Sequence, residues 1–203
     1  MRVILASASP RRRELLRALI ASFEVLPTDI DETLTGDGFV DAERLAYAKA
    51  LNAFERNPDA VVIGSDTVVY DDEHAYGKPH SPDHAFRMWQ QLRGRAHTVA
   101  TGIAVLAPGT DRQLTEAWDV ELSPLSDDEI RAYVASGRPM DKAGAYAIQD
   151  EDVPTVVHMH GCYCAIMGLP LWSLKDLLEA SGVPCAEPSS AFERCATCPS
   201  KPA

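Results

Sequence analysis

The chain of 203 residues is 46% hydrophobic and carries a formal net charge of −11 at pH 7, which suits one domain or two lobes sharing a buried core. The acidic balance argues against DNA or RNA as a partner, because backbone binding depends on lysine and arginine, although a local basic patch and a divalent cation can still accommodate a nucleotide. No apolar run approaches the ~18 residues of a membrane span, and arginines follow the first strand too early for a secretory signal, so we expect a cytoplasmic protein without a membrane partner.

Hydrophobic periodicity predicts strands and helices that alternate along the chain, which is typical of an α/β fold with a mixed sheet. Strands are predicted at residues 2–6, 22–26, 60–69, 96–106, 113–123, 153–160 and 163–167, with a hairpin over 68–78. Helical spacing, capping serines and first-turn prolines predict helices at residues 10–20, 39–56, 82–92, 126–137 and 169–179. Because Pro, Ser, Cys and Ala dominate the end of the chain, we divide it into a domain at 1–183 and a disordered tail at 184–203.

The turn between the first strand and the first helix suits an anion. Ser7 and Ser9 precede the helix, and its first turn contains Arg11, Arg12 and Arg13. Free backbone N–H groups and the helix dipole favour negative charge there, and arginine adds bidentate donors for phosphate oxygens. The alternative is a solvated basic helix start, but we interpret the segment as a site for a phosphorylated small molecule.

Three charged side chains stand out in the segments that follow. Asp66 lies within the apolar run 61–69, where a carboxylate is costly unless it is paired, metal-bound or at an opening. It is either a catalytic or metal-binding carboxylate or a buried aspartate that caps backbone groups. Glu32 belongs to an acidic loop that could hold a divalent cation or simply face solvent. Lys78 follows the predicted hairpin, which returns it toward the end of the sheet that holds Asp66.

The segment DKAGAYAIQ at 141–149 combines small residues, which permit close backbone approach, with a glutamine. Gln149 carries both a donor and an acceptor and therefore suits the edge of a base. An ordinary connection between a loop and a strand is the alternative. His97 is tempting as a base, but we interpret it as a structural histidine at the start of a strand.

Five cysteines are present, an odd number. Cys162 and Cys164 fall in a predicted strand with both side chains on one face, whereas Cys195 and Cys198 lie in the predicted tail. The Cys-x-x-Cys spacing of the second pair is that of half a zinc site. Because no second Cys or His pair lies nearby in the sequence, we interpret the tail cysteines as reduced thiols in a mobile segment.

Taken together, these segments resemble the Maf family of septum-formation-inhibitor-like nucleotide pyrophosphatases. The resemblance extends over residues 5–178. The matching motifs, in family order, are LASASPRRRELL at 5–16, IDE at 30–32, RLA with KA at 44–50, GSDTVV at 64–69, GKP at 77–79, LRG with HTV and TG at 92–102, DKAGAYAIQ at 141–149 and GLPL at 168–171. Each motif is weak alone, but eight in order are specific.

The resemblance implies an elongated, two-lobed α/β fold with a mixed sheet and a central cleft, related to the inosine-triphosphate pyrophosphatase fold. It implies cleavage of nucleoside triphosphates between the α and β phosphates with a divalent cation, Mg²⁺ or Mn²⁺, by a protein that is often a homodimer. Asp66 is implied to be the catalytic proton acceptor and a metal contact, Glu32 to assist with the metal, and Lys78 to act beside the triphosphate. The implied phosphate-binding residues are Ser7, Arg11 and Lys49.

The positions implied to set base specificity are Arg12, Thr67 and Gln149. Their identities resemble the branch that acts on dTTP and UTP, and Lys142, Tyr146 and Gln149 distinguish this branch from the one that acts on 7-methyl-GTP. The chain departs from the family pattern after Gln149, where DEDVP replaces a Gly-rich stretch, and at Ala165, where many members have Asn. Three added carboxylates would repel a triphosphate if they faced it.

Three hypotheses follow from this resemblance. The first is a housecleaning pyrophosphatase that hydrolyses dTTP and UTP, including modified pyrimidine nucleotides. The second is the same reaction on 7-methyl-GTP or another base. The third is a non-catalytic, nucleotide-binding regulator of cell division, which only the altered loop after Gln149 supports.

Overall fold

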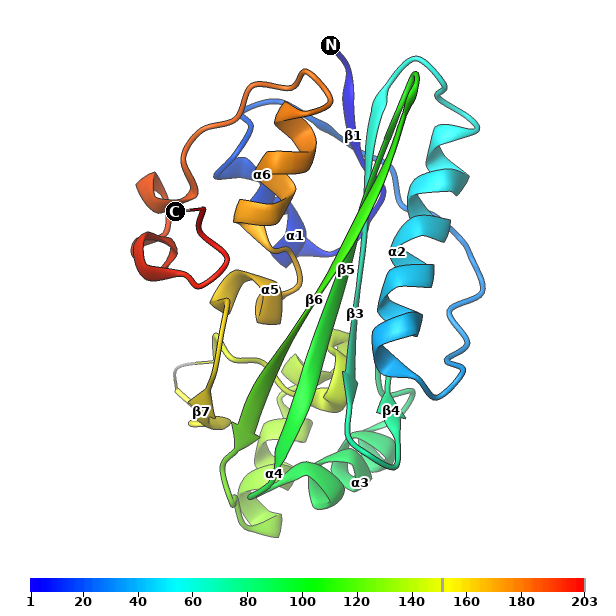
Figure 1. Cartoon of the computed structure of the whole chain (residues 1–203). Helices are drawn as coiled ribbons and strands as arrows, with labels where there is room; N and C mark the ends of the chain where they lie inside the picture. The colour runs from blue at the N-terminus through cyan, green and yellow to red at the C-terminus, as the bar shows by residue number, and fades with distance from the viewer. Residues whose placement is uncertain (151, 203) are drawn as a thin grey trace.

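A long mixed sheet lies at the centre of the molecule in the computed structural model, which describes residues 1–150 and 152–202 (Figure 1). The strand order is β2 (Glu24–Val25), β1 (Val3–Leu5), β3 (Val61–Tyr70), β5 (Ala96–Ala107), β6 (Thr110–Leu122) and β7 (Val156–Met159), with β4 (Ala75–Tyr76) paired to β3. Strand β1 runs parallel to both β2 and β3, and the other pairs are antiparallel. The prediction of an α/β fold with a mixed sheet is therefore confirmed.

The helices begin at the capping signals that the sequence carries. Ser9, Ser81 and Ser126 cap the helices α1, α3 and α4, and Asp37 caps α2. The helices are α1 (Pro10–Arg17), α2 (Gly38–Phe54), α3 (Pro82–Leu92), α4 (Asp127–Ala135), α5 (Tyr163–Met167) and α6 (Leu171–Glu179). Short 3₁₀ helices follow at η1 (Arg138–Asp141), η2 (Ala143–Ala145), η3 (Pro188–Ser190) and η4 (Glu193–Thr197). No helix in the described residues is long and apolar enough to cross a membrane.

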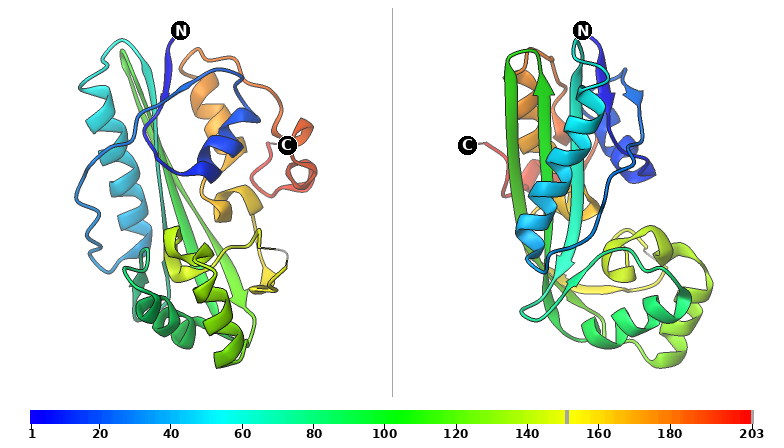
Figure 2. Two further views of the ribbon diagram at one scale, coloured as in Figure 1. Left: turned by 180° about the vertical axis from the view of Figure 1, so that it is seen from behind. Right: turned by 90° about the vertical axis from the view of Figure 1, so that its right-hand side faces the viewer.

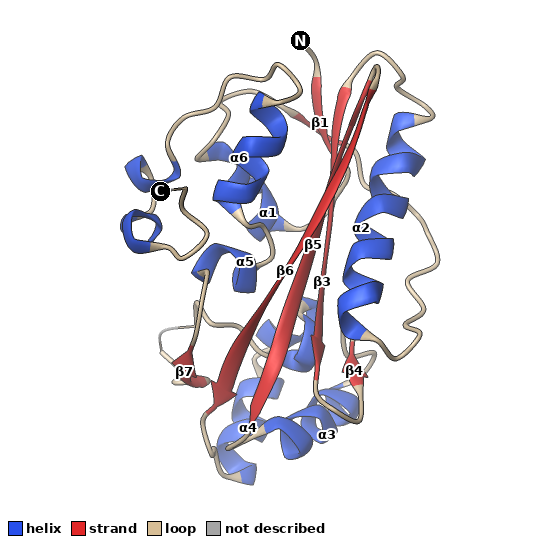
Figure 3. Ribbon diagram, viewed as in Figure 1, coloured by secondary structure: helices blue, strands red, loops and turns tan. Residues whose placement is uncertain are grey.

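Helices cover both faces of the sheet because successive strand residues point to opposite sides (Figures 2 and 3). Val62 packs under α2, whereas Val61 and Ile63 belong to the core that α1 and α6 cover on the other face. The long strands β5 and β6 continue into a second core, where Trp89 of α3 and Tyr133 of α4 are buried. The molecule consequently has two lobes that share the sheet.

Two glycines allow α2 to lie unusually close to the sheet. A Cβ atom on Gly64 of β3 would lie 2.2 Å from the carbonyl oxygen of Ala46, and one on Gly102 of β5 would lie 2.3 Å from that of Ala42. Any side chain at either position would collide with the helix backbone. These glycines therefore set the distance between α2 and β3.

The sheet has a gap along one edge of β3. Strand β1 pairs with β3 as far as Leu5 opposite Ile63, and β4 begins its pairing at Tyr76 opposite Val69. Between these points, over residues 64–68, β5 is the sole neighbour of β3 among the strands of the described residues. Asp66 lies in the middle of this stretch, so its position in an apolar strand is explained by an opening in the sheet.

The predicted strand at 163–167 is wrong, because this segment forms helix α5. A five-residue apolar run is ambiguous between strand and helix when judged by hydrophobicity alone. Here the Cys162 side chain accepts a bond from the Ala165 amide at the start of the helix, and Gly168 ends it with a φ of 114°. Cys162 and Cys164 consequently do not lie on one face of a strand.

The segment for which we expected disorder packs against the body of the protein. Within residues 184–202, η3 and η4 fold back over α6, and Cys195 is buried in the core that also contains Trp172. The indole nitrogen of Trp172 donates to the Cys195 carbonyl oxygen at 2.9 Å. Composition alone predicted disorder because it takes no account of these contacts with distant residues.

Candidate active site

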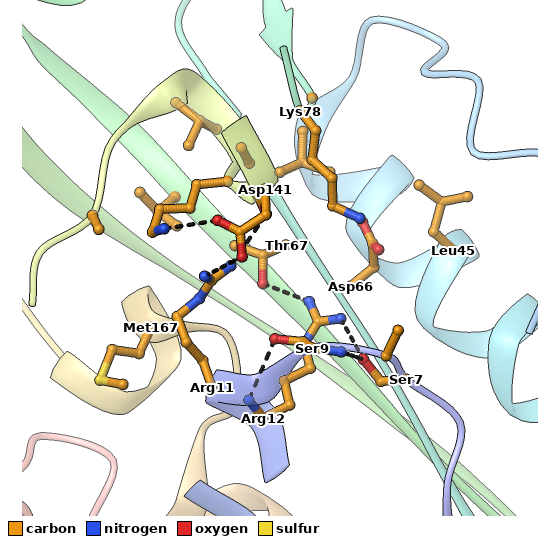
Figure 4. A pocket seen from close by; sticks show the side chains of 18 of the residues that line it. Ser7, Ser9, Arg11, Arg12, Leu45, Asp66, Thr67, Lys78, Asp141 and Met167 are labelled. Carbon is orange, nitrogen blue, oxygen red and sulfur yellow. Dashed lines mark hydrogen bonds and ion pairs between the residues drawn. The ribbon is translucent and has the colours of Figure 1, made fainter. Parts of the chain in front are cut away.

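A cavity of about 480 Å³ opens at the gap in the sheet (Figure 4). It is bounded by the loop after β1, the middle of β3, the turn after β4 and the segment that includes η1 and η2. All nine residues to which the resemblance assigned a role line it, namely Ser7, Arg11, Arg12, Glu32, Lys49, Asp66, Thr67, Lys78 and Gln149. The structure therefore brings together residues that the sequence separates by more than a hundred positions.

The turn between β1 and α1 is held by its two serines. The Ser9 hydroxyl accepts a bond from the Arg12 amide at 3.4 Å, and the Ser7 hydroxyl accepts one from the Ser9 amide at 3.3 Å. Pro10 occupies the first turn, where a missing N–H costs nothing. The N-terminal end of α1 is thereby turned toward the cavity, whereas Arg13 is not among the residues that line it.

The buried guanidinium group of Arg12 connects three segments of the chain by hydrogen bonds. Its Nε donates to the Gly168 carbonyl oxygen at 2.9 Å, and its two terminal nitrogens donate to Ser7 at 3.3 Å and to Thr67 at 3.0 Å. Burial lowers the pKa of Arg12, while the charge of Asp66 opposes that change. Thr67 also exchanges a bond with Thr101 at 3.0 Å. Arg12 thus fixes the position of Thr67 and of the turn after β1.

Two carboxylates and two lysines lie on the other side of the cavity. The Lys49 ammonium group pairs with Glu32 at 2.7 Å and also contacts Asp66, and all three side chains come from different segments. Lys78 lies 3.7 Å from the second oxygen of Glu32 and is more exposed than Lys49. Burial acts to raise the pKa of Glu32, but the hydrogen bond from Lys49 and the charges of both lysines outweigh it and lower that pKa.

Arg11 and Asp141 meet across the cavity mouth, opposite Asp66 and Lys78 (Figure 4). Arg11 donates to the Asp141 carboxylate at 2.8 Å and to its carbonyl oxygen at 3.2 Å. Lys142 donates to the other carboxylate oxygen at 2.7 Å. Burial acts to raise the pKa of Asp141, but the interactions with Lys142 and Arg11 outweigh it and lower that pKa. No local signal in the sequence predicts this pairing, because 130 positions separate Arg11 from Asp141.

The segment 141–149 approaches the cavity through a sharp turn. Gly144 and Ala145 have φ values of 68° and 58°, and the Trp89 indole donates to the Ala145 carbonyl oxygen at 2.7 Å. Tyr146 follows, and its hydroxyl group is 2.7 Å from Nε2 of His97. Burial lowers the pKa of His97 to about 4, so this histidine is neutral near pH 7. His97 is buried and does not line the cavity, which agrees with the interpretation of it as a structural residue.

The acidic stretch after Gln149 turns away from the cationic side chains of the cavity. Asp150 accepts a bond from the Tyr133 hydroxyl at 2.5 Å, and Asp152 pairs with Arg138 at 2.6 Å. Neither carboxylate lines the cavity. Glu151, the third carboxylate of the stretch, lies outside the described residues. The two described carboxylates are therefore engaged by partners in the second lobe.

The donor set of the cavity suits a hard divalent cation. Asp66 and Glu32 both reach the Lys49 ammonium group, and their carboxylate oxygens are the ligands that Mg²⁺ and Mn²⁺ prefer. Within residues 1–150 and 152–202, no ready-made group of three or more His, Cys, Asp or Glu ligands occurs. This fits a cation that is completed by water and by phosphate oxygens, as Mg²⁺ commonly is.

The similarity of this chain to known proteins covers almost all of the described fold. The family model for Maf-like proteins matches residues 2–181. A dTTP/UTP pyrophosphatase of Gloeobacter violaceus is 44% identical over 182 residues, covering 88% of this chain and 95% of its own. That of Aquifex aeolicus is 41% identical over 180 residues, with coverage of 88% and 95%. That of Thermomicrobium roseum is 42% identical over 214 residues, with coverage of 100% and 95%. The chain therefore belongs to the Maf-like protein family.

Proposed function

We propose that this protein hydrolyses dTTP and UTP to the nucleoside monophosphate and pyrophosphate. The observation that carries the proposal is the cavity itself, where two carboxylates face a set of cationic side chains from four separate segments. Its volume of about 480 Å³ falls within the range of about 300–1,000 Å³ that is usual for small-molecule sites. The relatives, which are dTTP/UTP pyrophosphatases, supply the substrate class.

The triphosphate would lie between the N-terminal end of α1 and the lysines of the opposite side. Ser7, Arg11 and Lys49 are the proposed phosphate-binding residues, and Lys78 is free enough in solvent to follow the terminal phosphates. Arg11 would exchange its bond with Asp141 for phosphate oxygens, which are well matched to its planar donors. The backbone N–H groups of the turn add further donors.

Asp66 is the proposed proton acceptor of the reaction. A water molecule attacks the α-phosphorus, the bond from that phosphorus to the bridging oxygen breaks, and Asp66 takes the proton that the water loses. Lys49 holds the carboxylates of Asp66 and Glu32 at fixed positions. A divalent cation bound by Asp66 and Glu32 would neutralise charge on the phosphates.

The base would lie toward the second lobe. Gln149 and Tyr146 line the cavity there, together with the apolar side chain of Ile148. The amide of Gln149 would pair with the edge of the pyrimidine. Arg12 is already bound to three protein oxygens, so its proposed part in specificity is to position Thr67 rather than to contact the base.

The test is pyrophosphate release from dTTP, UTP, CTP, ATP, GTP and 7-methyl-GTP with Mg²⁺ or Mn²⁺, for the wild type, Asp66→Asn and Asp176→Asn. Asp176 is an exposed carboxylate on α6 and serves as the matched control. We expect dTTP and UTP to be hydrolysed fastest, and Asp66→Asn to lower the rate by about 10²–10⁴-fold. Removal of the cation with a chelator should abolish release.

Each other outcome leads to a different conclusion. Faster release from 7-methyl-GTP would keep the reaction but replace the substrate. Unchanged release by Asp66→Asn would exclude Asp66 as the proton acceptor. Tight binding of dTTP without any release by the wild type would favour the nucleotide-binding regulator.

A further inference from the structure

Four cysteines from two distant segments meet outside the cavity, and we call them the tail cluster: Cys162, Cys164, Cys195 and Cys198. The sulfur atoms of Cys164 and Cys195 are 3.6 Å apart although 31 positions separate them in the chain. A hydrogen bond with the Cys198 thiol acts to raise the pKa of Cys162, so these two thiols are neighbours as well. Cys195 and Cys198 alone have the spacing of half a zinc site, and folding places a second cysteine pair directly beside them.

The sulfur separation is compatible with a zinc site and is not that of a disulfide. A disulfide requires about 2.05 Å between sulfur atoms, far less than the 3.6 Å observed between Cys164 and Cys195. A tetrahedral zinc site with Zn–S bonds of about 2.3 Å has sulfur atoms about 3.8 Å apart. The observed separation is therefore close to the edge of a zinc–thiolate tetrahedron.

The local chain geometry also suits ligation. Cys195 and Cys198, in and directly after η4, have the Cys-x-x-Cys spacing that is typical of structural zinc sites. Cys162 and Cys164 at the start of α5 supply two further sulfur atoms from one short segment. The amide of Ala165 already donates to the Cys162 sulfur at 3.4 Å. We propose that the tail cluster binds one zinc ion, which fixes the C-terminal segment to α5.

The side chains as placed form two contacting pairs, and the described residues contain no ready-made group of three metal ligands. Zinc would draw the pairs together by side-chain rotation. Cys198 is only partly buried and so has room to move.

Positive charge is available for the resulting zinc–thiolate centre. Arg194 lies 4.4 Å above the Tyr163 ring, and Lys201 lies 5.7 Å from the centre of the Trp172 ring, both within the C-terminal segment. The nearby Glu116 carboxylate is occupied by bonds that include those from Trp118 and Ser200, each at 2.8 Å. The segment has only short 3₁₀ helices of its own, so a metal would supply much of the free energy that orders it.

The test is the metal content of the full chain, purified under reducing conditions and reconstituted with zinc, for the wild type, Cys198→Ser and Cys185→Ser. Cys185 is the fifth cysteine, lies outside the tail cluster and is the matched control. We expect one zinc ion per chain in the wild type and in Cys185→Ser, and at least a tenfold lower affinity in Cys198→Ser. Cobalt in place of zinc should give the thiolate charge-transfer absorption of a tetrahedral site.

The cobalt spectrum of the wild type tests the proposal even if a variant fails to fold. A reduced wild-type protein that takes up neither zinc nor cobalt would overturn it. Equal zinc affinity in Cys198→Ser and the wild type would also do so, as would disulfides that form in the cluster while zinc is supplied in excess.

Discussion

The close approach of α2 to β3 should make Gly64 intolerant of even one added carbon atom. In Gly64→Ala the new Cβ would lie 2.2 Å from the Ala46 carbonyl oxygen and 2.6 Å from the Ala50 amide nitrogen. Relief of both contacts requires α2 to move away by about 1 Å, because unstrained non-bonded contacts are more than 3 Å. Both obstacles are backbone atoms, which cannot rotate aside.

This displacement should affect stability and catalysis together. Overpacking of this kind costs about 1–3 kcal/mol, and we expect the upper end, which corresponds to a fall in Tm of about 6–12 °C for a chain of this size. The same movement carries Lys49 away from Asp66 and Glu32. Misplacement of a site residue by about 1 Å can lower the rate about 10²-fold.

Thermal unfolding and pyrophosphate release would be measured for Gly64→Ala and for Gly109→Ala. Gly109 lies in the turn between β5 and β6, where a Cβ meets no atom within 4 Å but the φ of 74° remains strained. Gly109→Ala should therefore lose about 1 kcal/mol or more of stability through strain alone, with unchanged activity. If Gly64→Ala kept the wild-type Tm and rate, α2 would not pack as closely as described.

Three further predictions concern the cavity and its surroundings. In Lys49→Met the carboxylates of Glu32 and Asp66 lose their shared partner. The free energy of unfolding, measured with denaturant, should therefore fall by about 3 kcal/mol, and pyrophosphate release should fall sharply. A stable, active variant would contradict this pairing. The pKa of His97 is about 4 in the folded protein and 6.5 when unfolded, so the unfolded chain binds more protons between these values. Stability should therefore fall by about 3 kcal/mol from pH 6.5 to pH 4, and a His97→Gln variant with the same pH dependence would refute this. Gln149→Ala should lower kcat/KM for dTTP and UTP about fivefold while ATP changes little, since a lost hydrogen bond is worth roughly 1 kcal/mol. An equal loss for all three nucleotides would argue against base recognition by this residue.

Local signals in the sequence were sufficient for the elements that depend on their own residues. Ser9 with Pro10 starts α1, Ser126 forms a capping box with Glu129, and both devices act through bonds within one turn. The alternating and apolar runs of β3, β5 and β6 were predicted for the same reason. The unusual position of Asp66 was also evident in the sequence, because a carboxylate inside an apolar strand requires a special environment.

What the sequence alone could not decide depended on contacts between distant residues. The gap in the sheet beside Asp66 exists because β1 ends at Leu5 and β4 starts only at Ala75, and no local pattern encodes that spacing. The same holds for the pairing of Arg11 with Asp141 across 130 positions.

The sequence by itself determined most of the elements and the mixed sheet, because capping and periodicity are local properties. The full set of residues around the cavity came from the resemblance to a known family, whose motifs lie far apart in the chain. Only the tertiary structure decided that Arg12 is buried and hydrogen-bonded to three segments, that 163–167 is a helix, and that the two cysteine pairs meet. The physical reason is that burial and proximity arise from packing between segments, which hydrophobicity along one segment does not specify.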